Sequence, residues 1–182
     1  MKTKLLIAAL FVALMTMGFD CINDPIIVSL NIDPLTKCYA INPGNNPNFS
    51  GTATIDPNDL IDDSYQDKIE NARIYDITVQ ATGTFAGSVT GGVVSINGIP
   101  ILTYDGSWSD FATEQSLVRG STHVHKDNRG IQELIRVLTQ RPVPTVTLAS
   151  SGSLTGGGVP PVPAGLGVCV YIYAQIDANI KQ

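Results

Sequence analysis

The stretch VCVYIYAQIDA, residues 168–178, gives the clearest indication of the fold. Apolar residues alternate along it with a period of two, which is the side-chain period of a β-strand. The opposite face carries Cys169, Tyr171 and Tyr173, so the middle of the stretch is apolar on both faces. A strand of this kind is typical of the interior of a sheet, and we expect strands on both of its edges. The residues expected to share one buried face are Val168, Val170, Ile172, Ala174, Ile176 and Ala178.

Other segments of the chain show the same two-residue period. They are rich in Val, Ile and Thr, which favour strands, and they are bounded by Gly, Pro, Asn and Asp, which favour turns. Strands are therefore predicted over residues 26–32, 49–55, 74–82 and 145–151. Residues 115–125 fit either a further strand or a loop.

One β-hairpin is predicted with its turn type. Asn97-Gly98 separates the apolar runs 93–96 and 99–104. Both central residues of a type I′ turn need a positive φ, which Asn and Gly tolerate best. Pro100 cannot donate a ladder hydrogen bond, so its strand should lie at a sheet edge or contain a bulge.

Two segments show helical spacing instead. Asp127 or Asn128 can cap a helix that covers roughly residues 129–140, and Pro142 ends it. Its apolar stripe, spaced i, i+3, i+4 and i+7, consists of Ile131, Leu134, Ile135 and Leu138. A second helix, residues 58–71, is predicted after the cap Asp56 and Pro57. Its stripe consists of Leu60, Ile61, Tyr65, Ile69 and Ala72.

The fold class follows from these elements. Charged residues make up only 15% of the 182-residue chain, against ~25% in average proteins. Gly, Pro, Thr and Ser replace them, as in proteins built from short strands and turns. We predict a mainly β protein with about seven or eight strands and two short helices. The expected architecture is a two-sheet sandwich of immunoglobulin or fibronectin-III type, formed by residues 21–182 as a single domain.

The amino end has the pattern of a secretory signal peptide, predicted over residues 1–20. Lys2 and Lys4 precede an apolar run, residues 5–15, which small residues follow. The run is shorter than the roughly 20 apolar residues that span a bilayer. Cleavage after Gly18 would release a soluble protein, whereas lipidation of Cys21 would anchor it to a membrane. Both alternatives remain open, because Phe19 and Asp20 fit poorly before a lipidated cysteine.

The chain has three cysteines, Cys21, Cys38 and Cys169. Export leads to an oxidising compartment, where thiols usually pair. If Cys21 is lipidated, Cys38 and Cys169 form the remaining pair, and they would tie the start of the domain to its last strand. Closing so long a loop contributes roughly 4 kcal/mol in the chain-entropy model. If Cys21 is not lipidated, a Cys21–Cys38 pair is also possible.

His123 and His125, the only histidines, are the candidate metal ligands. In an extended segment they project from one face, which is the spacing of strand-borne zinc or copper sites. A third ligand is required, and the sequence does not indicate one. The chain has no nucleophile-elbow motif and no phosphate-binding loop. We therefore expect no catalytic residues and no cofactor.

The function expected from these features is binding or adhesion without catalysis. The formal charge of −5 argues against nucleic acid as a partner. The expected place is the bacterial periplasm, the outer membrane surface or the extracellular medium. The expected partner is an envelope or extracellular protein or a glycan, and membrane contact is expected only through a lipid anchor. One alternative is a self-assembling structural subunit, and another is a metal-dependent enzyme that uses His123 and His125.

Overall fold

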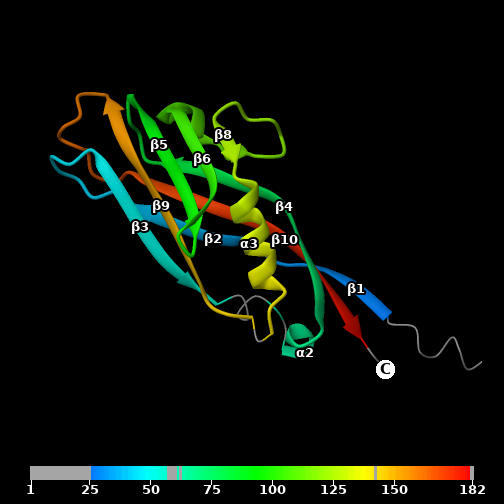
Figure 1. Cartoon of the computed structure of the whole chain (residues 1–182). Coiled ribbons are helices and arrows are strands. Elements are labelled where there is room, and N and C mark those ends of the chain that lie inside the picture. Colours follow the sequence, from blue (N-terminus) through cyan, green and yellow to red (C-terminus); the bar gives the residue numbers. More distant parts are fainter. Residues whose placement is uncertain (1–25, 57–60, 62, 142, 181–182) are drawn as a thin grey trace, which may run out of the picture.

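The computed structural model describes residues 26–56, 61, 63–141 and 143–180. Within them the chain is mainly β, and its strands form two five-stranded sheets (Figure 1). This confirms the predicted mainly β fold with two sheets, although the described residues form ten strands and not seven or eight. The predicted signal peptide, residues 1–20, and Cys21 lie outside the described residues.

The first sheet has the order β1-β10-β4-β7, and β2 also pairs with β10. All of its pairs are antiparallel. Because β1 and β2 pair with successive parts of the same edge of β10, the long strand β10 has neighbours along both sides. The strands of this sheet are β1 (Ile26–Asn31), β2 (Leu35–Ala40), β4 (Ile69–Thr82), β7 (Gln115–Ser116) and β10 (Gly167–Ile180).

The second sheet has the order β3-β9-β5-β6-β8, again antiparallel throughout. The predicted hairpin is confirmed between β5 and β6, with φ of 49° at Asn97 and 80° at Gly98. Pro100 lies beside a register shift in this pair, so the predicted bulge is also present. The strands of this sheet are β3 (Asn48–Ile55), β5 (Gly87–Ile96), β6 (Ile99–Ser107), β8 (Val124–Lys126) and β9 (Val146–Gly156).

The immunoglobulin or fibronectin-III type is not confirmed. Those sandwiches pair several strands with the next strand along the chain. Among the described strands, β5 and β6 are the one consecutive pair that is hydrogen-bonded together. Most other connections carry the chain from one sheet to the other, as from β2 to β3, from β3 to β4 and from β9 to β10.

The interior position of β10 is confirmed. The six residues predicted for its buried face, from Val168 to Ala178, are each at most 2% exposed. Five of them, all except Ala178, belong to one hydrophobic core to which both sheets contribute. Trp108 and Phe111, on the 3-10 helix η3 (Trp108–Ala112), complete this core and are buried.

The predicted helix over residues 58–71 is wrong from residue 67 onward. The structure has a four-residue helix, α2 (Asp63–Gln66), and then the strand β4 from Ile69 onward. Residues 57–60 and 62 lie outside the described residues. Ile69 and Ala72 are both buried although they are three residues apart in a strand. A bulge at Glu70 explains this, because Ala178 pairs with Ile69 while Asp177 pairs with Asn71.

The predicted helix over residues 129–140 is confirmed as α3 (Asn128–Leu138). Asp127 caps it, since its carboxylate accepts a hydrogen bond from the Arg129 amide at 2.9 Å. Leu134 and Leu138 are buried in the core. The first turn lies directly against β6, and a Cβ atom at Gly130 would overlap the carbonyl oxygen of Pro100. Glycine at position 130 therefore permits the close contact between α3 and the second sheet.

A tyrosine joins the two sheets. The Tyr39 hydroxyl on β2 donates a hydrogen bond to the Leu148 carbonyl oxygen on β9, at 2.9 Å. Gly51 on β3 leaves room for its ring, because a Cβ there would overlap it. Burial raises the pKa of Tyr39 to about 12. Burial also raises the pKa of Tyr104, which shares a hydrogen bond with Ser150.

Gly130→Ala should destabilise the protein by about 1–3 kcal/mol, because the added methyl group must push α3 away from β6. Gln132→Ala, at an exposed position of the same helix, is the matched control and should change stability by less than about 0.5 kcal/mol. Urea unfolding followed by tryptophan fluorescence measures both. Equal stability of the two variants would show that α3 does not need this contact.

Stability should fall as the pH rises from about 10 to 12. Tyrosines whose pKa is raised in the folded state contribute stability below the pKa of the unfolded chain, near 10, and lose it as the pH passes the folded value. Tyr39→Phe should reduce this alkaline loss, whereas Tyr75→Phe, at an exposed position, should not. Unfolding free energies of the three proteins at several pH values provide the comparison. An identical alkaline profile for Tyr39→Phe would contradict the assignment.

Candidate functional site

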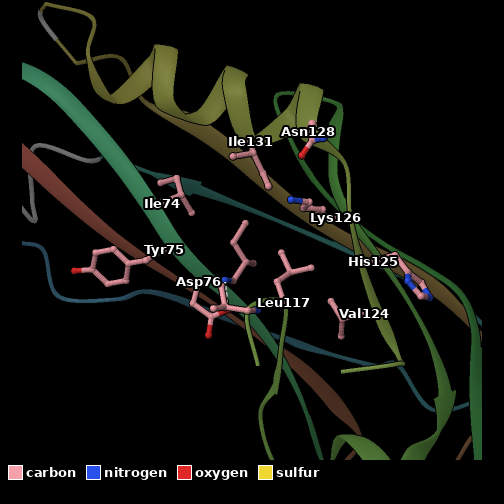
Figure 2. Close-up of a pocket in the computed structure, with 11 residues that line it drawn as sticks. Ile74, Tyr75, Asp76, Leu117, Val124, His125, Lys126, Asn128 and Ile131 are labelled. Atoms are coloured by element: carbon pink, nitrogen blue, oxygen red, sulfur yellow. Dashed lines mark hydrogen bonds between the residues drawn. The ribbon is translucent and has the colours of Figure 1, made fainter. Parts of the chain in front are cut away.

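A groove with a volume of about 640 Å³ lies between β4, the segment that runs from the end of β7 through β8, and the first turn of α3 (Figure 2). Grooves of this size accommodate small organic molecules. Three separate parts of the chain form it, near residues 75, 117 and 126. It is therefore a product of the tertiary structure and not of one sequence motif.

The floor of the groove is apolar. Ile74, Leu117 and Ile131 are partly buried and pack against the core, and Val124 is 4% exposed. Ile74 reaches the groove because of a bulge in β4: Tyr173 of β10 pairs with Asp76, but Ala174 pairs with Ile74, so Tyr75 is the extra residue. The bulge also leaves Tyr75 43% exposed at the groove wall.

Asp76 on β4 fixes the wall of the groove that is formed by the segment after β7. One carboxylate oxygen accepts a hydrogen bond from the Ser116 hydroxyl at 2.6 Å. The other accepts from the amides of Ile77, at 2.9 Å, and Val118, at 3.3 Å. The Ser116 hydroxyl oxygen in turn accepts from the amides of Val118 and Arg119. Because these bonds occupy the Asp76 carboxylate, we assign it to the structure of the wall.

Lys126 provides the positive charge at the groove. Figure 2 shows its side chain between Ile131 on α3 and Leu117 and Val124. Its ammonium group has no hydrogen-bond or ion-pair partner among the described residues. The nearby Arg129 is different, since its guanidinium pairs with the Asp127 carboxylate at 3.1 Å. Hydrogen bonding from Arg129 lowers the pKa of Asp127, so that pair is internally neutral.

The two histidines have different surroundings. His123 packs edge-on against Phe111, with ring centroids 6.0 Å apart, and its Nε2 lies 3.7 Å from an Asp110 carboxylate oxygen. Its Nδ1 lies 3.2 Å from the Asp105 carbonyl oxygen. His125 is exposed and lines the groove. Within the described part of the chain, no group of three or more His, Cys, Asp or Glu residues is placed to hold a metal ion. The third ligand that the metal hypothesis requires is not found there.

Cys38 and Cys169 form a disulfide. This is the pairing that was predicted for the case in which Cys21 takes no part in a disulfide. They lie directly opposite each other on β2 and β10 and are separated by 131 residues in sequence. β2 itself was missed in the sequence, where residues 35–40 show no clear period. A disulfide is typical of an oxidising environment outside the cytoplasm. In the described residues, no helix is long and apolar enough to cross a membrane.

Sequence comparison gives no family. No protein-family model matches the chain, and no curated protein is significantly similar to it. Among solved structures, it is similar to a chain of Desmodium yellow mottle tymovirus, with 10% sequence identity and a TM-score of 0.34. The similarity covers 88% of this chain and 91% of that chain. At this level the likeness supports no inference about function.

The sequence pattern does not indicate the groove or a binding role for Lys126. The apolar residues of the floor fit ordinary core patterns, and only the bulge in β4 and the packing of α3 direct them to one place. One signal was available: Lys126 directly precedes the predicted helix cap at Asp127, so it had to lie near the amino end of α3.

Removal of the disulfide by the double substitution Cys38→Ala and Cys169→Ala should lower the free energy of unfolding by about 4–5 kcal/mol, because the unfolded chain loses a long loop constraint. Reduction of the wild-type protein should have the same effect, whereas the reductant should not change the double variant. Urea unfolding with and without reductant measures this. A reduced wild-type protein as stable as the oxidised one would refute the prediction.

Proposed function

We propose that this chain is a non-catalytic binding protein that acts outside the cytoplasm, and that the groove holds a small amphipathic anion. The observation that carries the proposal is an apolar floor with the ammonium group of Lys126 beside it, which has no partner in the part of the chain that the structure describes. An apolar pocket with few polar groups is the usual form of a small-molecule site, in which the polar groups fix the orientation of the ligand.

The charge of the ligand follows from Lys126. The chain as a whole carries −5 and repels anions, so an anionic ligand needs a local cation. Asp76 keeps its negative charge, but its carboxylate is held in the wall of the groove by three hydrogen bonds, and no ion pair joins it to Lys126 among the described residues. The apolar part of the ligand would cover Ile74, Leu117 and Ile131, while its carboxylate or phosphate would pair with Lys126.

The place of action is part of the same proposal. The signal-peptide pattern of residues 1–20 and the Cys38–Cys169 disulfide both fit export to a bacterial envelope or the medium. Release after cleavage and anchoring through Cys21 remain the two alternatives. The ligand would then be a component or product of the envelope surroundings, in place of a nucleic acid or a metal ion.

We propose a jelly-roll arrangement instead of an immunoglobulin type. Strands that alternate between two sheets, with one central hairpin, β5–β6, are typical of the two Greek keys of a jelly roll. The order β2-β10-β4-β7 beside β3-β9-β5-β6 fits this pattern. Such sandwiches occur in binding proteins and assembly proteins, so the fold alone does not select the function.

Decanoate and its neutral analogue decanol test the ligand class. NMR titration with decanoate should shift amide signals of groove residues such as Leu117 and Ile131. Lys126→Met should weaken decanoate binding about fivefold, the size of a surface ion pair, and leave decanol binding unchanged. Lys37→Met, on β2, is the matched control and should change neither.

Three results would contradict this function. Signal shifts that cluster away from the groove would move the site elsewhere, and the absence of binding for both probes would remove the site. Equal weakening of decanoate and decanol by Lys126→Met would show that the lysine packs against the ligand and does not recognise its charge.

A further inference from the structure

The strand β1 has a free edge. It pairs with β10 on one side, from Ile26 opposite Ile180 to Asn31 opposite Gln175. On its other side no strand pairs with it among the described residues. Figure 1 shows β1 and the end of β10 running together away from the second sheet. The outer backbone groups of β1 are therefore available for a further strand.

The two-residue period of a strand shows which backbone groups of β1 face outward. The Ile32 amide donates to the Ala174 carbonyl of β10, so position 32 is oriented toward β10. Backbone groups alternate in direction along a strand, and positions 27, 29 and 31 therefore face outward. At the start of the strand, Ile26 is 47% exposed and Ile27 is 46% exposed. The free edge thus combines unpaired backbone groups with exposed apolar side chains.

This edge lacks the features that usually prevent strand pairing, which are charges, proline, bulges and short length. β1 has the sequence IIVSLN and carries none of the first three. By contrast, β2 has Lys37 on its inner face, and β7 has two residues. β8 has three residues and carries Lys126. The free edge of the second sheet, β3, exposes Thr and Ser instead of Ile.

We infer that β1 pairs with β1 of a second copy of this chain, antiparallel, so that the two first sheets become one continuous sheet. An isologous pair needs a surface that is complementary to itself. A neutral strand meets this condition, because no like charges face each other across the twofold axis, although each copy is acidic overall. The outward positions are symmetric about Ser29, which would place Ile27 opposite Asn31 of the second copy.

The apolar face supports a second copy as the occupant. Val28 and Leu30 are half-buried on the inner face of β1, and the exposed Ile26 lies on the same face. In the antiparallel pair, Ile26 of each copy lies beside the other copy's half-buried Leu30 and Ile32. The apolar inner face of the sheet then continues across the axis, and Ile26 becomes buried. The contact is small, so the dimer should be weak, in the micromolar range.

Sedimentation equilibrium of the purified exported protein, over a range of concentrations, tests this inference. The wild type should show a monomer–dimer equilibrium. Ile27→Lys places a charge on the edge, and Ile27→Pro removes an outward donor without removing a bond to β10. Each should weaken the dimer at least tenfold and leave the melting temperature unchanged. Thr52→Lys, at an exposed position of the other free edge, is the matched control and should leave the dimer intact.

Three results would overturn the inference. They are a wild type that stays monomeric up to millimolar concentration, a dimer that persists in both folded Ile27 variants, and a dimer that is lost in Thr52→Lys. The last result would assign the contact to β3. None of these outcomes depends on decanoate binding, so this inference and the proposed function can fail separately.

Discussion

The backbone ladder of β10 is the constraint on which the rest of the structure depends. β4 pairs along one edge of this strand, and β1 and β2 share the other. One face of β10 supplies core residues from Val168 to Ala178, and the disulfide joins its other face to β2. Because β10 lies near the carboxyl end of the chain and its partners come much earlier, the first sheet is built almost entirely from contacts distant in sequence. Such a sheet gains from a covalent constraint, since loop closure costs more entropy as loops lengthen.

The two bulges in β4 explain why the start of this strand resembles a helix in the sequence and how the groove is formed. A bulge at Glu70 allows Ile69 and Ala72 to face the core together, and a bulge at Tyr75 does the same for Ile74 and Ile77. Each bulge changes the apolar spacing from two residues to three. Spacing of three and four residues is the signature of a helix, and this is why Ile69 and Ala72 fit a helical stripe in the sequence. At Tyr75 the same irregularity directs side chains into the groove, which agrees with the frequent occurrence of bulges next to binding sites.

The groove and the free edge of β1 lie on different parts of the first sheet and suggest different uses. The groove is closed by α3, whose approach to β6 needs glycine at position 130. One wall is fixed by the hydrogen bonds of Asp76. Lys126 is held separately, by the pairing of β8 with β6, where it lies opposite Leu102. The edge of β1 instead offers backbone groups that pair with no other described strand, and two exposed isoleucines. A protein that pairs through this edge would present two grooves in one assembly, which raises the effective affinity for ligands arrayed on a surface.

The sequence by itself determined those elements whose signal is local. The alternation of β10, the Asn97-Gly98 hairpin and the capped stripe of α3 each lie within a short window, and the structure confirms all three. If Cys21 is set aside, two cysteines remain, and this count also indicated the Cys38–Cys169 bond. Only the tertiary structure decided the strand order, the strand β2 and the groove. Strand order depends on which distant edges pair, and bulges shift the register without a clear local signature. The binding groove could not be predicted for the same reason, because Ile74, Leu117 and Lys126 are brought together by the pairing of strands and not by their spacing in the chain.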